Sequence, residues 1–343
     1  MRHGLIFSGG GVGMRKMVEL ARRAEQAGVD SIYLTEAWRS GFVGLSAIAM
    51  ATERVEIGPY ILNAYARSVW VTAMSAVDLD ELSGGRLVLG VGSGNKHIND
   101  VWQGVPRERP LRKMDEYVTL LRKAVGTPLG ETLEWQGEMH RMNWAPAVPP
   151  LRPAIPVYLA ALYPRMTAVA GRVADGLALG ALLSPEYIRD ELKPVFQGAA
   201  AEAGRDPNGL GTYFAPFVSV DEDEAVARNA ARSAICRLYD PLPHPYYHHL
   251  LCEQGFAKAG EAAAKHVPEG RMDQAMEAMG DEVLDKVAIV GTLEQCRDQL
   301  ARFSGIVDQA LLVNVNYSGA SEEALLDAYQ SLIDLASRTA SPT

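Results

Sequence analysis

Two side chains suited to redox or proton-transfer chemistry follow the apolar run at residues 31–35. Glu36 is a carboxylate that can take part in proton transfer, and Trp38 carries an indole that can stack on a flat ring system. Each of these two residues can also have a purely structural role. A glutamate also suits the positive end of a helix dipole, and a tryptophan can simply cover the core. We therefore treat Glu36 and Trp38 as candidate catalytic residues.

A second polar segment ends the apolar run at residues 55–62. Gly58 and Pro59 lie inside that run, and because proline has no N–H to donate, they indicate a bulged or distorted strand. Asn63 and Arg67 follow. Arg67 can neutralise the phosphate or carboxylate of a ligand, or it can form a surface ion pair.

Further segments combine small residues with free backbone N–H groups. The first follows an apolar run at residues 86–91 and has Lys96 beside it, and the second opens a helix with a proline near its first turn. Clustered amides and helix N-termini bind anions, so both segments are candidate phosphate sites. The candidate cofactor-binding residues in these segments, with a glycine that follows a later strand, are Ser93, Gly94, Asn95, Ala160, Ala161, Arg165 and Gly180.

Two other patterns carry less information. The glycine-rich stretch at residues 8–13 matches neither the dinucleotide fingerprint nor the phosphate-binding P-loop, so we interpret it as a turn at the mouth of the fold. His244 and His248 have the i, i+4 spacing of a helical metal site, but no acidic residue stands at a matching position, and we expect no metal. With Tyr246 and Tyr247, this segment is better interpreted as a lid.

The elements that must position these residues alternate along the chain. Apolar runs typical of buried parallel strands are each followed by a stretch with helical periodicity. Eight such units predict a (β/α)8 TIM barrel rather than an open sheet, with the active site at the C-terminal ends of the strands. The predicted strands are residues 4–8, 31–35, 55–62, 86–91, 157–160, 177–179, 212–220 and 309–315.

Two insertions interrupt this alternation. Residues 131–144 have the pattern of a β-hairpin, and residues 240–280 form a longer insert rich in helical pattern. No low-complexity segment or linker divides the chain, so we expect a single domain over residues 1–343.

Composition limits the class of partner. The net charge of −9 disfavours nucleic acid and anionic membranes, and no apolar run approaches the ~18–20 residues that span a bilayer. No signal-peptide pattern opens the chain. The three cysteines are scattered and odd in number, which favours a reducing compartment. We expect a cytoplasmic protein that acts on a small molecule.

Several motifs together resemble the bacterial luciferase-like family, especially its branch that uses coenzyme F420, a deazaflavin. Residues 79–94 are similar to the family's LDELSGGRxxLGxGxG stretch, and residues 51–58 to ATERIxxG. Residues 170–176 and 289–294 match two further family motifs. The resemblance covers nearly the whole chain except the insert at 240–280.

Residues 58–67 are similar to the GPGVTNPYTR segment of methylene-tetrahydromethanopterin reductases. The resemblance implies a non-proline cis peptide near Tyr60–Ile61, in a bulge behind the deazaflavin ring. It also implies a phosphate on the loops at 93–95 and 161–165, and a homodimer. Two departures stand out: Glu36-Ala37-Trp38 replaces the DH or EHH of other members, and Asn63-Ala64 replaces Asn-Pro.

The resulting prediction is an F420-dependent oxidoreductase that transfers hydride at carbon 5 of the ring. Glu36 is the first choice of proton donor, and Tyr65 and His97 follow. Alternatives are an FMN-dependent monooxygenase on the same fold and a non-catalytic flavin-binding protein. A Rossmann dehydrogenase is disfavoured, because the dinucleotide fingerprint is missing.

Overall fold

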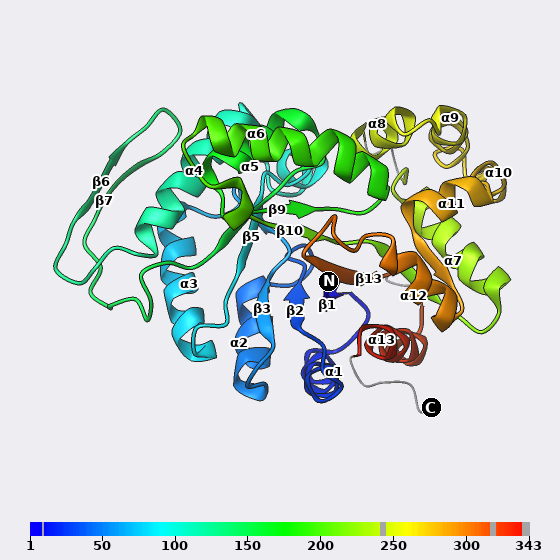
Figure 1. The fold of residues 1–343 in the computed structure, drawn as a ribbon, viewed down its shortest axis with the longest axis horizontal. Helices are drawn as coiled ribbons and strands as arrows, with labels where there is room; N and C mark the ends of the chain where they lie inside the picture. Colours follow the sequence, from blue (N-terminus) through cyan, green and yellow to red (C-terminus); the bar gives the residue numbers. More distant parts are fainter. Residues whose placement is uncertain (9, 241–244, 316–319, 338–343) are drawn as a thin grey trace.

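A ring of parallel strands with helices around it forms the centre of the molecule (Figure 1). This computed structural model describes residues 1–8, 10–240, 245–315 and 320–337. The strand order is β3-β2-β1-β13-β10-β9-β8-β5-β4, and because β3 and β4 are consecutive in the chain, the strands form a barrel. The strands in this order are β1 (Arg2–Phe7), β2 (Ser31–Leu34), β3 (Glu56–Pro59), β4 (Leu62–Asn63), β5 (Leu89–Gly92), β8 (Val157–Ala160), β9 (Gly176–Leu179), β10 (Gly211–Phe214) and β13 (Gln309–Asn314). A further strand, β11 (Phe217–Val220), lies off this path and pairs with β13.

The surrounding helices form where apolar residues recur three or four positions apart. In α1, Met17, Leu20, Ala21 and Ala24 are buried on one face. Gly84 ends α3 with a φ of 68°, a left-handed conformation that favours glycine. The helices that follow the strands are α1 (Met14–Gln26), α2 (Gly41–Ala51), α3 (Val69–Ser83), α4 (Pro110–Ala124), α5 (Pro164–Val173), α6 (Lys193–Glu202), α7 (Glu224–Arg237) and α13 (Glu322–Ala336).

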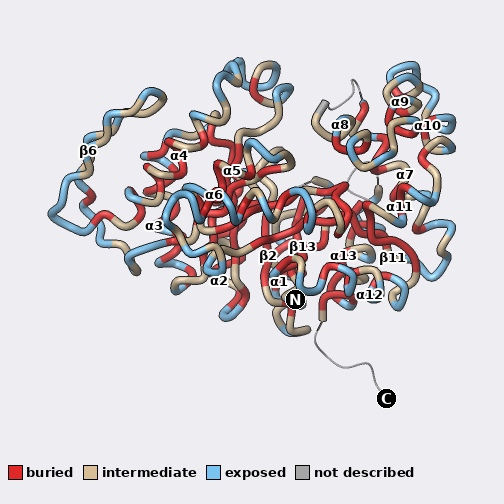
Figure 2. The backbone as a smooth tube through the Cα atoms, turned by 45° about the horizontal axis from the view of Figure 1, so that its top comes forward, coloured by how far each residue is buried: buried red, intermediate tan, exposed pale blue. Residues whose placement is uncertain are grey.

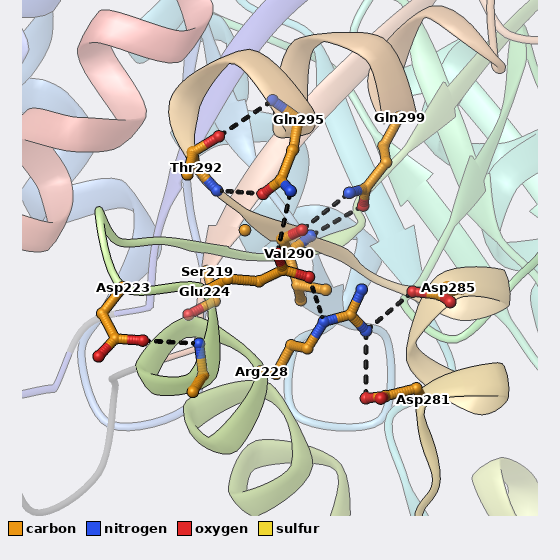
Figure 3. Close-up of polar contacts among 12 residues, drawn as sticks. Ser219, Asp223, Glu224, Arg228, Asp281, Asp285, Val290, Thr292, Gln295 and Gln299 are labelled. Carbon is orange, nitrogen blue, oxygen red and sulfur yellow. Dashed lines mark hydrogen bonds and ion pairs between the residues drawn. The ribbon is translucent and has the colours of Figure 1, made fainter.

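The predicted (β/α)8 barrel is confirmed, with three differences in the strands. The predicted third strand, residues 55–62, is divided into β3 and β4. The predicted seventh strand is divided into β10 and β11, and both pair with β13. An additional strand, β12 (Ile289–Gly291), pairs with β11 outside the ring and precedes α12 (Leu293–Ala301). The side-chain amide of Gln299 on α12 bonds to both the N–H and the C=O of Val290, at 2.9 and 2.7 Å (Figure 3).

Both predicted insertions are present. The hairpin consists of β6 (Leu133–Gln136) and β7 (Arg141–Trp144), which form a largely exposed arm beside α4 (Figures 1 and 2). The helical insert comprises α8 (Pro245–Glu253), α9 (Ala257–His266), α10 (Met272–Ala278) and α11 (Asp281–Val287). Arg228 of α7 pairs with Asp281 and Asp285, which joins α11 to α7 (Figure 3).

Side chains fill the interior of the barrel. The buried rings of Tyr33, Tyr158 and Tyr213 pack together there with aliphatic side chains. Glu56, at the start of β3, accepts hydrogen bonds from Tyr33 at 2.7 Å and Tyr213 at 3.0 Å. Arg2 pairs with the same carboxylate at 3.1 Å. This packing leaves the C-terminal ends of the strands as the place where a ligand can enter.

Candidate active site

The break between β3 and β4 marks one side of the barrel mouth. A cis peptide bond joins Tyr60 to Ile61, as the resemblance implied. The Tyr60 side chain lies inside the barrel and donates a hydrogen bond to the Leu179 carbonyl at 2.8 Å. Burial raises the pKa of Tyr60 well above its ordinary value, so the phenol remains neutral. Tyr60 therefore contributes its backbone, and not its side chain, to the mouth of the barrel.

Glycines in β5 allow the segment between β3 and β4 to approach. A Cβ at Gly92 would overlap the Cδ1 atom of Ile61 and lie 3.0 Å from the Cβ of Ala160. A Cβ at Gly90 would overlap the backbone carbonyl of Pro59. Ile61, Gly92 and Ala160 thus come together from the third, fourth and fifth strands of the barrel.

Glu36 and Arg67 form a two-pronged ion pair between the loops after β2 and β4. Nε and Nη2 of Arg67 donate to the two carboxylate oxygens, at 3.0 and 2.6 Å. The side chains are only 14% and 20% exposed, and Glu36 also accepts the N–H of Gly41 at the start of α2. The hydrogen bonds to Glu36 raise the pKa of Arg67 above its ordinary value. Two roles were predicted for Arg67, neutralising a ligand or forming an ion pair, and in this structure it forms the ion pair.

A cavity of about 470 Å³ opens beside this ion pair. Trp102 lies in its wall, and the ring of Trp38 stands 6.3 Å from the ring of Trp102, with 62% of Trp38 exposed. Sequence reasoning missed Trp102 and the other residues of the π-helical turn η1 (Ile98–Trp102), which follows β5. The lining residues are Glu36, Ala37, Asn63, Ala66, Arg67, Ser68, Val71, Ile98, Trp102 and Gln103.

Buried amides connect this cavity to the loop after β5. Asn63 is 7% exposed and donates to the side chain of Asn99 at 2.6 Å. Asn99 in turn donates to the Ser93 carbonyl at 2.8 Å. Gly94 has a φ of 60°, and a Cβ there would lie 2.6 Å from Nδ2 of Asn63. The Asn63 side chain therefore shapes the loop.

A cation that sequence reasoning missed lies at the predicted phosphate loop. Arg107 places Nη2 2.8 Å and Nε 3.3 Å from the Ser93 hydroxyl. The predicted cation, Lys96, instead pairs with Asp100 and is largely exposed. Asn95 accepts the N–H of Ile98 at 2.7 Å. The feature of the sequence that could have indicated Arg107 is its place in the same loop, just before α4.

The loop after β8 and the start of α5 provide a second group of donors. Pro164 is the first residue of α5, as predicted. Arg165 is exposed, and its side chain makes no hydrogen bond or ion pair with any described residue. Gly180 lies nearby, because a Cβ there would be 3.2 Å from the Leu162 side chain and 3.6 Å from the Tyr247 hydroxyl.

The first helix of the insert lies over these loops. Tyr246 of α8 accepts a hydrogen bond from Tyr163 through its backbone carbonyl, and its hydroxyl contacts Arg107. Gln254, just after α8, bonds to the Ser184 N–H at 2.9 Å. The interpretation of this segment as a lid fits this placement. His244 lies outside the described residues, and within them no three His, Cys, Asp or Glu side chains gather in a metal-binding arrangement.

The other two candidate proton donors are less enclosed. The Tyr65 hydroxyl donates to the Glu108 carbonyl, and burial raises the pKa of Tyr65. His97 is exposed, with its ring 6.0 Å from the ring of Trp102. Of the three candidates, Glu36 alone lines the cavity.

A (β/α)8 barrel with a cavity at the C-terminal ends of its strands is an architecture typical of enzymes. Comparison with known proteins identifies the family. The luciferase-like monooxygenase family model matches residues 3–309, so the chain belongs to that family. Its members are oxidoreductases, including monooxygenases, which supports an enzymatic role.

Individual proteins resemble the chain over most of its length. The 5,10-methylenetetrahydromethanopterin reductase of Methanolobus tindarius is 30% identical over 297 residues, 85% of this chain and 87% of that one. The structure of the coenzyme F420-dependent tetrahydromethanopterin reductase of Methanopyrus kandleri has a TM-score of 0.76 at 22% identity, and the match covers 97% of this chain and 98% of that one. An F420-dependent secondary alcohol dehydrogenase, with an F420–acetone adduct, has a TM-score of 0.73 at 18% identity, covering 98% of each chain.

Within the described residues, no helix combines the length and apolar character needed to cross a bilayer.

Proposed function

We propose that this protein is a coenzyme F420-dependent oxidoreductase acting on a small organic molecule. The observation that carries the proposal is the arrangement at the mouth: Ile61, at the cis peptide, stands against Gly92 and Ala160 beside a cavity and two arginine-bearing loops. Relatives whose names include this coenzyme, or a reductase of the same kind, support the choice.

The residues present suit such a cofactor. Ser93, Arg107 and Arg165 offer a hydroxyl and two guanidinium groups, and no carboxylate pairs with either arginine within the described residues. This donor set matches a phosphate. The apolar surface of Ile61 and Ala160 suits one face of a planar ring. When bound, the deazaflavin supplies a carbon that accepts or donates hydride.

The chain's own part is binding, orientation and the exclusion of water. Ser93, Gly94 and Asn95, with Ala161 and Arg165, would hold the phosphate, and Gly180 would give room beside it. Tyr60 would support the ring through its backbone and Ile61 through its apolar surface, and Asn63 would fix the loop after β5 that carries Ser93 and Gly94. Glu36 would exchange a proton with substrate across the cavity, with Arg67 holding its carboxylate in place and Trp38 covering the opening.

The charge balance of the cavity favours an uncharged substrate. Among the described residues that line it, Glu36 and Arg67 are the only charged ones, and they neutralise each other. A carboxylate or ammonium group entering there would lose water without gaining an unpaired partner. We therefore propose a neutral substrate, such as an alcohol, a ketone or an unsaturated carbonyl compound. In competition assays, neutral compounds should inhibit, whereas their carboxylate analogues of equal size should not.

Titration of the purified apoprotein with F420 and, separately, with FMN tests the cofactor. We expect saturable binding of F420, followed by through changes in its fluorescence, and at least tenfold weaker binding of FMN. Turnover is then sought with a panel of neutral alcohols and carbonyl compounds. Tight binding of FMN with none of F420 would favour the FMN-dependent monooxygenase, the alternative that the family name supports. Binding of F420 without turnover against any donor or acceptor would favour a non-catalytic carrier.

We further propose that the chain is a single cytoplasmic domain that forms a homodimer through α2 and α3. The helix α2 contains no charged residue, yet Val43 and Met50 are 67% and 70% exposed on it. On α3, Trp70 is 48% exposed. Exposed apolar groups on two adjacent helices are typical of a protein–protein contact.

A further inference from the structure

Arg107 is a partly buried cation whose guanidinium forms no ion pair with any described residue. Its guanidinium contacts the Ser93 hydroxyl through Nε and Nη2, and its backbone N–H donates to Asp100 at 3.1 Å. Within the described residues, no carboxylate forms an ion pair with this guanidinium. Arginine in this setting matches the planar, doubly accepting geometry of a phosphate.

Tyr246 of α8 contacts the nitrogen of the Arg107 guanidinium that does not contact Ser93. Its hydroxyl bonds to Nη1 of Arg107, and its ring lies 5.2 Å from the guanidinium carbon. The Tyr246 backbone carbonyl accepts from Tyr163, in the loop after β8. Tyr246 thus bridges the two loops on which the phosphate is expected, after β5 and after β8. A neutral phenol is a weaker partner for arginine than a phosphate dianion.

We propose that Arg107 binds the phosphate of the cofactor and that Tyr246 occupies Arg107 until the phosphate displaces it. The helix α8 would then report whether the cofactor site is filled. The inference rests on the proposed function only in that the cofactor carries a phosphate, so it applies to F420 and FMN alike. Arg107 is unassigned by any sequence pattern above, and its role follows from the contacts with Ser93 and Tyr246.

The first test separates phosphate binding from ring binding. Dissociation constants are measured for F420 and for its phosphate-free deazaflavin chromophore, on the wild type and on Arg107→Ala. We expect Arg107→Ala to weaken F420 binding by about tenfold or more, as for a lost charged hydrogen bond, and to leave the chromophore unchanged. Arg109→Ala is the control, because it removes the same charge from the same loop but pairs with exposed Glu138.

Equal affinity of Arg107→Ala and wild type for F420, or equal losses for F420 and the chromophore, would overturn the assignment. If the wild type binds no F420, the proposed function fails instead. The same comparison is then made with FMN and riboflavin, and an equal effect of Arg107→Ala on those two would overturn the inference.

The second test addresses Tyr246. Since Tyr246→Phe removes the competing hydroxyl but keeps the ring, we expect F420 to bind as tightly as to wild type, or a few-fold more tightly. Amide hydrogen exchange in residues 245–253 should rise when F420 is added to the wild type. A loss of F420 affinity in Tyr246→Phe as large as that in Arg107→Ala, or unchanged exchange in α8, would show that Tyr246 is not displaced.

Discussion

At the scale of residues, the Glu36–Arg67 pair unites a structural and a functional role. Because both side chains are largely buried, removing one leaves the other charge without its partner. We expect Arg67→Met to lower the free energy of unfolding by about 2 kcal/mol and to reduce cofactor-dependent turnover. Denaturant unfolding measures the first effect. The double variant Glu36→Gln, Arg67→Met should recover part of the stability but none of the turnover, and full recovery of turnover would contradict a role for Glu36.

Two glycines in β5 allow a sharper comparison, since they differ in what an added methyl group meets. Gly90→Ala meets the backbone carbonyl of Pro59 and should destabilise the fold by about 2–3 kcal/mol. Gly92→Ala meets the movable end of the Ile61 side chain and, at 3.0 Å, the Cβ of Ala160, so stability should fall less than in Gly90→Ala while cofactor affinity falls. Thermal unfolding and cofactor titration separate the effects. Gly198→Ala in α6, with open space around it, is the control, and equal behaviour of the two β5 variants would refute the distinction.

The candidate residues that sequence reasoning found were those directly after strands. Glu36 and Asn63 follow apolar runs, and strand ends of a barrel necessarily converge. The pairings at the site were not predictable in this way. Arg67 pairs with a residue 31 positions earlier, and Arg107 returns to Ser93 across 14 positions of irregular loop. No local periodicity encodes where such a loop turns back.

At the scale of elements, a single carboxylate on α4 holds the β6–β7 hairpin. Glu116 accepts the backbone N–H groups of Glu138, Met139 and His140, at 2.9–3.1 Å. Burial alone would raise the pKa of Glu116, but these hydrogen bonds and Arg112 outweigh it and lower the pKa. The carboxylate form is therefore the one that stabilises the hairpin.

This lowered pKa sets a pH dependence. The contribution of Glu116 is complete above its ordinary value of 4.5 and is lost as the pH falls through the lowered folded-state value. We expect hydrogen exchange in residues 131–144 to increase in acid, and Glu116→Gln to show faster exchange already at pH 7. The variant Glu131→Gln, at an exposed glutamate, is the control. Unchanged exchange in Glu116→Gln would show that the hairpin is held by other contacts.

Some elements were predicted closely. The helix predicted at residues 69–82 is observed as Val69–Ser83, and the predicted hairpin is present. The division of the seventh strand and the three-residue β12 were not anticipated. Short strands contain too few positions for an alternation to appear, and their pairing depends on neighbours far along the chain.

At the scale of the whole molecule, the dimer proposal makes a prediction about mass in solution. The helices α2 and α3 lie side by side, and α2 carries exposed Val43 and Met50 (Figure 1). We expect light scattering to give twice the chain mass for the wild type and the single chain mass for Met50→Lys. Val226→Lys, at a half-exposed valine on α7, should leave the dimer intact. A monomeric wild type would end the proposal.

The additional strand β12 forms a border of the sheet beyond the barrel, and its residues are buried under neighbouring helices. Such borders readily recruit the strands of other molecules and so promote aggregation. Here the outward N–H and C=O of Val290 are already satisfied by one side chain, that of Gln299. A glutamine can imitate the bonding of a neighbouring strand because its amide carries one donor and one acceptor side by side. The side chain of Gln299 thus takes the place of a neighbouring strand at this border, so Val290 offers no unpaired N–H or C=O for another chain to bind.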